Sequence, residues 1–327
     1  MAKTFSDLDT PCFLVDLDKV KQNAQRMLDT CARLNLQLRA HTKTHKTLCL
    51  ALVEKLDKFH VMVSGPDGLA TLKAHTENLP AGKKWSIVLE VDCGYGRTGF
   101  AVWGQEVIDA ALVITKSASL ELEAIYCHCG DLYSVRSKQL REAQQKRNAA
   151  SLCGLQEKLK KFGVSCKFGT GSTPTCSLPI EFNRNLSEFH PGAYIFYDYE
   201  QYLLNACKES DIACRVMTRV VAHKPELNMI IVDCGFTAIS HDGMAQRLPD
   251  ADFCLIQGEA NLKMIGMSQE LGKIVAKEGD LDCSQYPIGT ILFIFPYHTC
   301  AAAAMHKEYF VHCADTVVTT WTPVRGW

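Results

Sequence analysis

Apolar runs and amphipathic stretches alternate along the first two thirds of the chain. Trp85–Val91 is apolar apart from Ser86 and Glu90, which predicts a strand buried on both faces. Further strands are expected at 12–15, 36–39, 59–63, 120–129, 165–168 and 189–196, and helices at 17–34, 47–56, 66–75, 105–116 and 137–162. This alternation predicts an α/β fold with a parallel sheet and right-handed crossovers, most simply a barrel.

The pattern changes from about Asp211. Strands are expected at Ala213–Ala222, Met229–Val232, Phe253–Ile256 and Thr290–Phe295, with turns between them and no good helices. We therefore predict two domains, a barrel over residues 1–210 and a β-rich domain over 211–327. Residues 1–15 could join the β-rich domain instead.

Composition and charge narrow the function classes. A net charge of −1 over 327 residues gives no reason to expect binding to nucleic acid or to an anionic membrane. No apolar run reaches the roughly 18–20 residues of a membrane span, and the first nine residues are too polar for a signal peptide. The 16 cysteines are scattered and show no disulfide framework, so we expect reduced thiols and a cytoplasmic protein.

The segment Arg39–Lys46 carries Lys43 between two histidines, directly after the predicted strand 36–39. The end of a strand followed by a helix is where an α/β barrel places its chemistry. A lysine nucleophile needs a partly desolvated pocket and nearby cations to lower its pKa, and His41 and His45 could be such neighbours. A basic surface turn is the alternative.

Two further strand ends carry candidate binding groups. Glycines surround Arg97, whose guanidinium could bind an anionic oxygen, although a plain turn with a solvated arginine explains the same residues. His128 ends the predicted strand 120–129, where it is either catalytic or a satisfied core histidine.

Two glycine-containing loops have the composition of a phosphate site. Gly169–Thr173 offers backbone N–H groups and three hydroxyls, and Gly192 and Ala193 could add two more N–H donors. Neither loop matches a P-loop or a dinucleotide fingerprint.

His298 and Cys300 lie in the predicted β-rich domain. In an extended segment, residues i and i+2 point to the same side, so this pair presents a nitrogen and a sulfur together. Such a pair fits an open zinc site completed by water or substrate. The alternative is that His298 and Cys300 stand close together by chance, since His312 and Cys313 are also adjacent in the sequence.

Together these stretches resemble the fold-type III pyridoxal 5'-phosphate (PLP) enzymes, the alanine racemase-like barrels. The chain is most similar to the eukaryotic D-serine dehydratases and their D-threonine aldolase relatives. The most specific segments are His41–Lys46 and Pro296–Cys300, and the resemblance extends over nearly the whole chain.

The resemblance implies a role for each candidate residue. Lys43 would hold PLP as a Schiff base and remove the substrate α-proton. The remaining cofactor-site residues would be Arg97 at the phenolic oxygen, His128 against the pyridine ring, Tyr126 and Tyr133 lining the site, and Thr170, Gly192 and Ala193 at the phosphate.

The resemblance also implies a reaction. Zinc on His298 and Cys300 would bind the β-hydroxyl of D-serine as a Lewis acid, so that pyruvate and ammonia form. D-threonine aldolase or D-threo-3-hydroxyaspartate dehydratase activity remains an alternative on the same site. The related enzymes imply a homodimer.

The first domain departs from the family in strand number. Only six barrel strands are predicted, whereas a barrel of this kind has eight. Only 12 residues separate Lys46 from Phe59, and two βα units of roughly 25 residues each appear to be missing there. We therefore expect an incomplete barrel, and a catalytically impaired or non-catalytic protein is the second functional hypothesis.

Overall fold

The computed structural model describes residues 3–41, 43, 60–74, 84–241 and 251–324. These residues form two compact units. The first contains 3–26, 41, 43, 192–241 and 251–324, and the second contains 27–40, 60–74 and 84–191. The expected division after residue 210 differs from this one in residues 192–210, which belong with the C-terminal strands. Residues 16–26, 41 and 43 also belong with those strands, beyond the residues 1–15 for which this was allowed.

The second unit is built on a sheet in which every ladder is parallel. The strand order is β2-β8-β7-β6-β4-β3, and β5 pairs with β4. The strands are β2 (Gln37–Leu38), β3 (His60–Val63), β4 (Trp85–Asp92), β5 (Phe100–Ala101), β6 (Leu120–His128), β7 (Lys167–Gly171) and β8 (Glu188–Phe189). Among the described residues, β2 and β3 are the two edges, so this sheet is open where the sequence predicted missing units.

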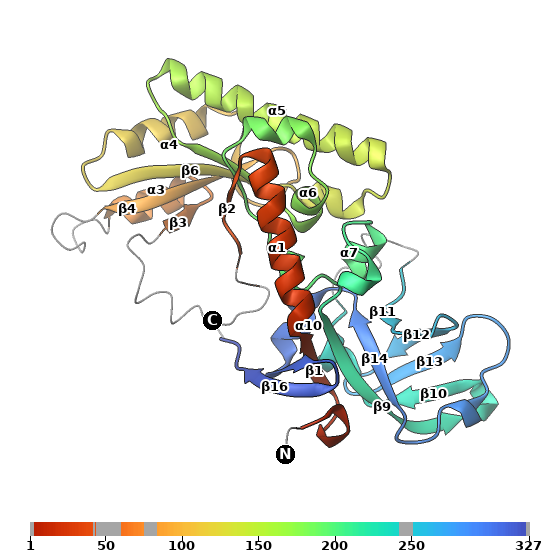
Figure 1. Cartoon of the computed structure of the whole chain (residues 1–327). Coiled ribbons are helices and arrows are strands. Elements are labelled where there is room, and N and C mark those ends of the chain that lie inside the picture. Colours follow the sequence, from red (N-terminus) through yellow and green to blue (C-terminus); the bar gives the residue numbers. More distant parts are fainter. Residues whose placement is uncertain (1–2, 42, 44–59, 75–83, 242–250, 325–327) are drawn as a thin grey trace. The chain divides into compact units, whose positions relative to one another are not determined.

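The helices of the second unit alternate with its strands, as predicted. They are α3 (Pro66–Ala74), α4 (Gln105–Thr115), α5 (Lys138–Lys161) and the short α6 (Thr173–Ser177), and the C-terminal half of α1 (Leu17–Leu34) also belongs here. Figure 1 shows α4 and α5 lying along the sheet. The buried side chains of α4 recur at helical spacing, at Val107, Ile108, Ala110, Ala111 and Ile114. The helix predicted at 47–56 lies outside the described residues.

Two strand predictions near the ends of this sheet were wrong. The strand predicted at 165–168 is β7, which starts later and runs through Gly169 and Gly171. The strand predicted at 189–196 is reduced to β8, after which the chain turns into a 3₁₀ helix at Ala193–Ile195. The sequence predicts a loop at Gly169 and Gly171. β7 needs these glycines because the neighbouring segment approaches closely. A Cβ on Gly171 would lie 2.4 Å from the carbonyl oxygen of His190.

The first unit contains a nine-stranded, mostly antiparallel sheet. Its order is β12-β13-β10-β9-β1-β15-β16, with β14 joining β9 to β11. The strands are β1 (Cys12–Asp16), β9 (Cys214–Lys224), β10 (Met229–Val232), β11 (Cys254–Ile256), β12 (Leu262–Met267), β13 (Gly272–Ala276), β14 (Ile291–Pro296), β15 (Tyr309–Cys313) and β16 (Thr316–Trp321). β1 runs parallel to β15 and antiparallel to β9, so the N-terminal strand is part of this sheet.

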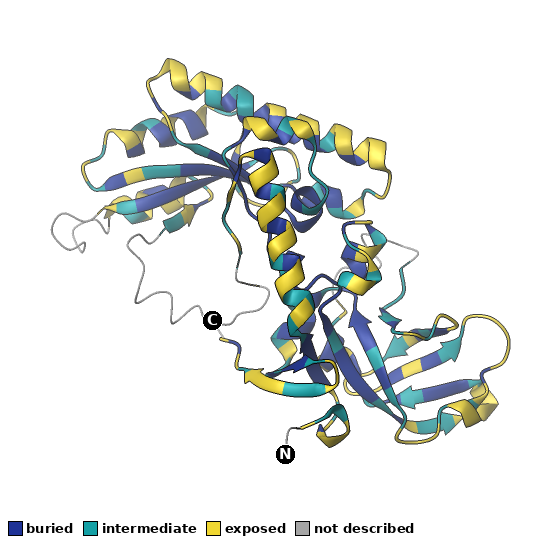
Figure 2. Ribbon diagram, viewed as in Figure 1, coloured by how far each residue is buried: buried dark blue, intermediate teal, exposed yellow. Residues whose placement is uncertain are grey.

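The core of the first unit lies between its strands and two short helices, α8 (Phe236–Ile239) and α10 (Thr299–Met305). A third short helix of this unit is α7 (Tyr199–Leu203). Five strands each contribute a fully buried apolar side chain to one cluster, namely Phe13, Val216, Ile230, Ile274 and Ile294. In Figure 2 the buried residues follow the strands, while exposed residues cover the outer faces of the helices.

The 3₁₀ helices among the described residues of both units are Phe5–Asp7, Gly130–Ser134, Glu181–Asn185, Ala193–Ile195, Glu209–Asp211, Pro225–Leu227 and Cys283–Gln285.

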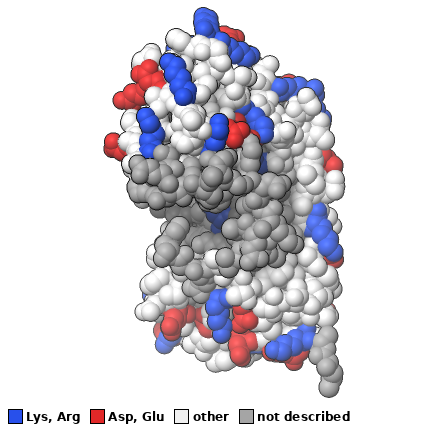
Figure 3. Space-filling model, turned by 90° about the vertical axis from the view of Figure 1, so that its left-hand side faces the viewer, with Lys and Arg blue, Asp and Glu red and all other residues white. Residues whose placement is uncertain are grey.

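The surface charge agrees with the near-zero net charge. Figure 3 shows acidic and basic side chains interspersed on the face in view. Within the described ranges, no helix is both long enough and apolar enough to cross a membrane. The cysteines in these ranges are all free thiols.

Candidate active site

The loop after β4 holds Arg97 in a defined position. The carboxylate of Asp92 accepts hydrogen bonds from three successive backbone N–H groups, those of Gly94 at 2.9 Å, Tyr95 at 2.8 Å and Gly96 at 2.9 Å. The φ angles of Gly94 and Gly96 are +116° and +80°, which explains why glycine stands at both positions. The loop predicted from its glycines is therefore built around one aspartate that the sequence argument did not use.

Glu90, near the end of β4, joins the Arg97 loop to the strand beside it. One carboxylate oxygen accepts from Arg97 Nη2 at 3.2 Å, and the other accepts from Ser64 Oγ at 2.7 Å and Thr98 Oγ1 at 2.9 Å. Glu90 is only 3% exposed, whereas the Arg97 side chain is 45% exposed. The buried carboxylate thus orients a guanidinium whose outer face remains open to an anion.

Three aromatic residues, Tyr126, His128 and Tyr133, meet at the end of β6. Tyr126 Oη lies 3.3 Å from His128 Nδ1, and the His128 ring stacks with Tyr133 at a centroid distance of 6.3 Å. Burial raises the pKa of the Tyr126 phenol well above 10, so this phenol stays neutral at physiological pH. The three side chains give one strand end both an aromatic surface and polar atoms.

A buried ionic group beside Tyr126 was missed by the sequence argument. Arg39 and His190 both bind the Glu188 carboxylate, with His190 Nε2 at 2.9 Å from Oε1. The His190 ring stacks on Tyr126 with centroids 4.4 Å apart and an interplanar angle of 15°. A carboxylate only accepts hydrogen bonds, so Nε2 carries the proton of His190. The available signal was the alternation Glu188-Phe189-His190 ahead of Pro191.

The predicted phosphate loop Gly169–Thr173 has its hydroxyls engaged within the protein. Thr170 is 1% exposed, and its hydroxyl lies 3.0 Å from Cys129 Sγ. Ser172 caps α6 through a bond from the Thr175 N–H at 3.3 Å. These bonds explain the hydroxyl-rich composition by local structure, because Ser and Thr are preferred at helix caps. A phosphate role for Thr170 stays a prediction.

The other cofactor-site predictions fall in the first unit. Lys43 is an exposed residue in a turn, Gly192 is half-buried, and Ala193 is 7% exposed at the start of a 3₁₀ helix. Arg97, Tyr126, His128, Tyr133 and Thr170 belong to the second unit. The assembly of these two sets into one pocket stays a prediction.

The predicted zinc pair stands at the start of α10. His298 is the extended N-cap residue, with φ −126° and ψ 107°, while Cys300 is already in the first helical turn. The expectation of an extended segment through Cys300 was therefore wrong. Both residues are half-buried and Thr299 between them is fully buried. No cluster of three or more metal-ligating side chains occurs within the described ranges.

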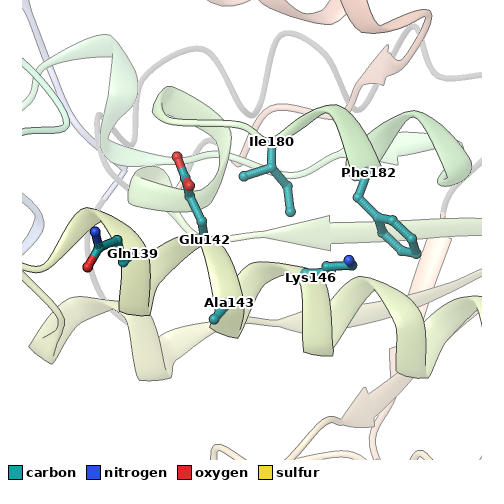
Figure 4. Close-up of a pocket in the computed structure, with 6 residues that line it drawn as sticks. All are labelled: Gln139, Glu142, Ala143, Lys146, Ile180 and Phe182. Atoms are coloured by element: carbon teal, nitrogen blue, oxygen red, sulfur yellow. The ribbon is translucent and has the colours of Figure 1, made fainter.

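A surface pocket beside α5 carries no comparable chemistry. Figure 4 shows its lining, which consists of Gln139, Glu142, Ala143, Lys146, Ile180 and Phe182. This lining combines one acid, one base and apolar side chains on an exposed helix, and it includes none of the candidate site residues above.

Two family models match the chain. "Alanine racemase, N-terminal domain" matches residues 49–200, and "Putative serine dehydratase domain" matches residues 213–312. The chain is thus similar to alanine racemases over its first part and to serine dehydratases over its second. These matches confirm the resemblance seen in the sequence.

Relatives and solved structures of this family match over the full length. The D-serine dehydratase of Dictyostelium discoideum is 28% identical and that of Schizosaccharomyces pombe 26%, covering 98% and 100% of this chain and 98% and 94% of those proteins. The structure of D-threo-3-hydroxyaspartate dehydratase from Delftia sp. HT23 has a TM-score of 0.89 at 23% identity, covering 99% of this chain and all of that one. The D-threonine aldolase of Filomicrobium marinum has a TM-score of 0.83 at 20% identity, covering 98% of this chain and 97% of its own. The alanine racemase-like fold is confirmed by these likenesses.

The alignment with the Dictyostelium relative is longer than this chain. It spans 387 positions, whereas this chain has 327 residues, so at least 60 positions of that protein have no counterpart here. Two βα units of roughly 25 residues each would leave a gap of about this size.

Proposed function

We propose that this protein is a PLP- and zinc-dependent lyase that converts D-serine to pyruvate and ammonia. The observation that supports this most is the end-to-end similarity to the D-serine dehydratase of Dictyostelium, which covers 98% of both chains. The two matched domains hold every candidate site residue except Lys43, which precedes the first of them.

The residues present fit PLP. The cofactor is an anion with a flat aromatic ring, and the second unit offers it the outward guanidinium of Arg97 and the aromatic groups Tyr126, His128 and Tyr133 at adjacent strand ends. When bound, PLP supplies an electron sink for the α-carbon. Lys43 would hold it covalently and take the α-proton at Nζ.

Each remaining residue would orient the cofactor. Arg97, held by Glu90, would donate to the phenolic oxygen, and the neutral Tyr126 would keep its phenol proton. Thr170, Gly192 and Ala193 would receive the phosphate. The backbone N–H of Ala193 can donate as well as that of any residue.

The residues also fit zinc. His298 and Cys300 provide an imidazole nitrogen and a thiol sulfur, both half-buried on either side of the buried Thr299, and this donor set suits Zn²⁺. A solved variant of D-threo-3-hydroxyaspartate dehydratase is in the metal-free form, so that relative binds a metal in other forms. Zinc would supply a Lewis acid for the substrate β-hydroxyl.

The substrate class within this chemistry has two alternatives. D-threo-3-hydroxyaspartate dehydratase from Delftia is 25% identical over the whole of both chains, and the D-threonine aldolase of Arthrobacter is 22% identical. Dehydration of D-serine releases pyruvate, dehydration of the hydroxyaspartate releases oxaloacetate, and aldol cleavage of D-threonine releases glycine and acetaldehyde. The products therefore distinguish the three.

A catalytically impaired protein is the second candidate. In the part of the chain that the structure describes, β2 and β3 are the edges of the sheet, and this favours the second candidate because Lys43 follows β2 in the sequence. A strand at a sheet edge pairs with a neighbour on one side only. We also propose a cytoplasmic homodimer that acts on a small D-amino acid.

Purified protein incubated with PLP tests the proposal. We expect a Schiff-base absorbance band that Lys43→Ala abolishes and Lys46→Ala retains, and borohydride reduction should attach the cofactor to the peptide containing Lys43. D-serine should then give pyruvate, and a zinc chelator should stop it. Absence of the band in the unaltered protein rules out the enzyme and leaves the impaired variant. Pyruvate formation that survives chelation would rule out the zinc role alone.

A further inference from the structure

The turn that carries the proposed zinc pair is bonded to a segment about a hundred residues earlier in the chain. The backbone N–H of Thr299 donates to Asp198 Oδ2 at 2.9 Å, and the N–H of Glu200 donates to the Tyr297 carbonyl at 3.0 Å. The Thr299 hydroxyl lies 2.8 Å from Cys214 Sγ. All of these residues belong to the first unit.

Asp198 itself is fully buried, with 0% exposure. Its second oxygen, Oδ1, accepts from the Gln201 N–H at 3.0 Å and so caps α7. One carboxylate thus joins the first turn of α7 to the first turn of α10. A buried carboxylate is costly unless it is well hydrogen-bonded, so its presence here calls for a role that a smaller cap residue could not fill.

The bonded N–H stands between the two proposed ligands. A hydrogen bond that fixes the peptide before Thr299 also fixes the backbone from which His298 and Cys300 project. Thr299 is fully buried and its two neighbours are half-buried. The two proposed metal ligands are therefore more exposed than the residue that is fixed between them. Groups that orient metal ligands in this indirect way strongly affect metal affinity.

We propose that Asp198 is a positioning residue for the metal pair. Its carboxylate holds the Thr299 N–H and thereby sets the separation of the His298 nitrogen from the Cys300 sulfur. The inference rests on the proposed zinc site and goes beyond it by naming the residue that preorganises that site. A purely structural role, capping α7, is the competing explanation.

Asp198→Ser separates the two roles. Serine caps helices as well as aspartate does, but its shorter side chain with a single oxygen cannot serve both α7 and Thr299. We expect Zn²⁺ affinity, measured by competition with a chromophoric chelator, to fall about 10- to 100-fold. The absorbance spectrum of bound Co²⁺, which reports thiolate ligation, should change as well. Asp282→Ser is the matched control, because Asp282 also caps a short helix of this unit through its side chain, and the hydrogen bonds of its carboxylate go to Ser284 and Gln285.

A second pair of variants tests the donor side of the same bond. Thr299 is the first residue of α10, a position where proline is accepted, and the extended His298 suits a residue before proline. Thr299→Pro removes the N–H, whereas Thr299→Val keeps it and removes only the hydroxyl. Zinc affinity should fall in the first and stay within about twofold of the unaltered protein in the second.

The outcomes separate this inference from the proposed function. If the unaltered protein and the variants His298→Ala and Cys300→Ala bind Zn²⁺ equally, the zinc site itself is wrong. If the unaltered protein binds through this pair and a folded Asp198→Ser binds equally well, the positioning role is overturned. If Asp198→Ser does not fold, the comparison of Thr299→Pro with Thr299→Val decides, and equal affinities there overturn the role. Failure of both Asp198→Ser and Thr299→Pro to fold, with a stable Thr299→Val, would assign Asp198 a purely structural role.

Discussion

The guanidinium of Arg39 binds the Glu188 carboxylate at two points, with Nε 2.9 Å from Oε1 and Nη2 3.1 Å from Oε2. Arg39 stands four residues before Lys43, at the end of an edge strand only two residues long. The backbone N–H groups of Gln37 and Arg39 also donate to the carbonyls of Ser187 and Phe189. This ion pair therefore reinforces the attachment of the short strand β2 and Arg39 to β8.

Glu188→Gln should destabilise the second unit. Glutamine cannot accept both arms of the guanidinium, and Arg39, only 29% exposed, would keep an imperfectly paired charge. We expect a loss of about 2–3 kcal/mol, somewhat less than for breaking a fully buried pair. For a unit of this size this corresponds to a fall in Tm of roughly 5–10 °C, measurable by thermal unfolding without cofactor.

An exposed ion pair on the same unit provides the control. Arg33 and Glu181 are 3.1 Å apart, with side chains 53% and 68% exposed. Glu181→Gln should cost about 0–1 kcal/mol. Equal effects of the two substitutions would show that the Arg39 pair does not reinforce this attachment. If Glu188→Gln retains PLP more weakly and Glu181→Gln does not, the Arg39 pair also supports the proposed site around Lys43.

The same glutamate predicts a dependence of stability on pH. Burial alone raises the pKa of Glu188, but hydrogen bonds from His190 and Arg39 outweigh it and lower the pKa from 4.5 to about 2. A carboxylate with a lowered folded-state pKa stabilises the protein above its unfolded pKa and loses this as pH falls. The contribution, on the order of 3 kcal/mol, should be complete above about pH 4.5 and decline towards pH 2.

The measurement is the difference in Tm between the unaltered protein and Glu188→Gln across pH. We expect a constant difference above about pH 5 and a shrinking one below about pH 4.5. Burial lowers the pKa of His190 below 6.5, so acid also destabilises the fold from about pH 6.5 downwards through this residue. A Tm difference that stays constant down to pH 3 would contradict the Glu188 prediction.

Glu90→Gln should weaken PLP binding more than it weakens the fold. The substitution removes the charge that orients Arg97 and disturbs the bonds from Ser64 and Thr98. Hydrogen bonds to charged groups contribute about 1.5–3 kcal/mol, so a fall in PLP affinity of tenfold or more is expected. Titration with PLP measures it by absorbance, and Glu157→Gln on the exposed face of α5 is the control. Unchanged affinity in a folded Glu90→Gln would mean that Arg97 does not need this partner.

The predictable parts of the fold are those with long periodic patterns. The strand Trp85–Asp92 was placed within about two residues because it is a continuous buried run, and the helix Lys138–Lys161 because its buried residues recur at helical spacing. β7 and β8 could not be placed in the same way, since close packing of His190 against Gly169 and Gly171 determines where the strands lie. The local sequence predicts a loop at these glycines, whereas their real role is to let a residue distant in sequence pack closely against the strand.

The candidate site divides in a similar way. Arg97 and His128 were predicted from their places at strand ends, and Tyr126 from the family resemblance. Glu90 and Glu188 were missed because a carboxylate in an apolar strand shows its importance only when its partners are known. Such partners come from elsewhere in the chain: Ser64 follows β3, and Arg39 follows β2. Residue type thus indicates which side chains could bind a ligand. Three-dimensional packing shows which other side chains hold those binding residues in place.

Gly99 and Gly94 offer a direct test of close backbone approach in the Arg97 loop. Both have left-handed φ angles, +113° and +116°. A Cβ added to Gly94 would meet nothing within 4 Å, whereas one added to Gly99 would lie 2.8 Å from the backbone carbon of Val91 and 3.0 Å from the Asp92 nitrogen. Gly99 must approach this closely because the next residue, Phe100, pairs with Val91 in the sheet.

Gly94→Ala should therefore cost only the conformational strain, about 1–2 kcal/mol. Gly99→Ala carries the same strain plus a backbone clash that no side-chain rotation relieves, so its loss should be at least twice as large. Thermal unfolding of both variants without cofactor measures the difference directly. Equal losses would show that the β4–β5 pairing tolerates a shift, so that the close approach of Gly99 is not required.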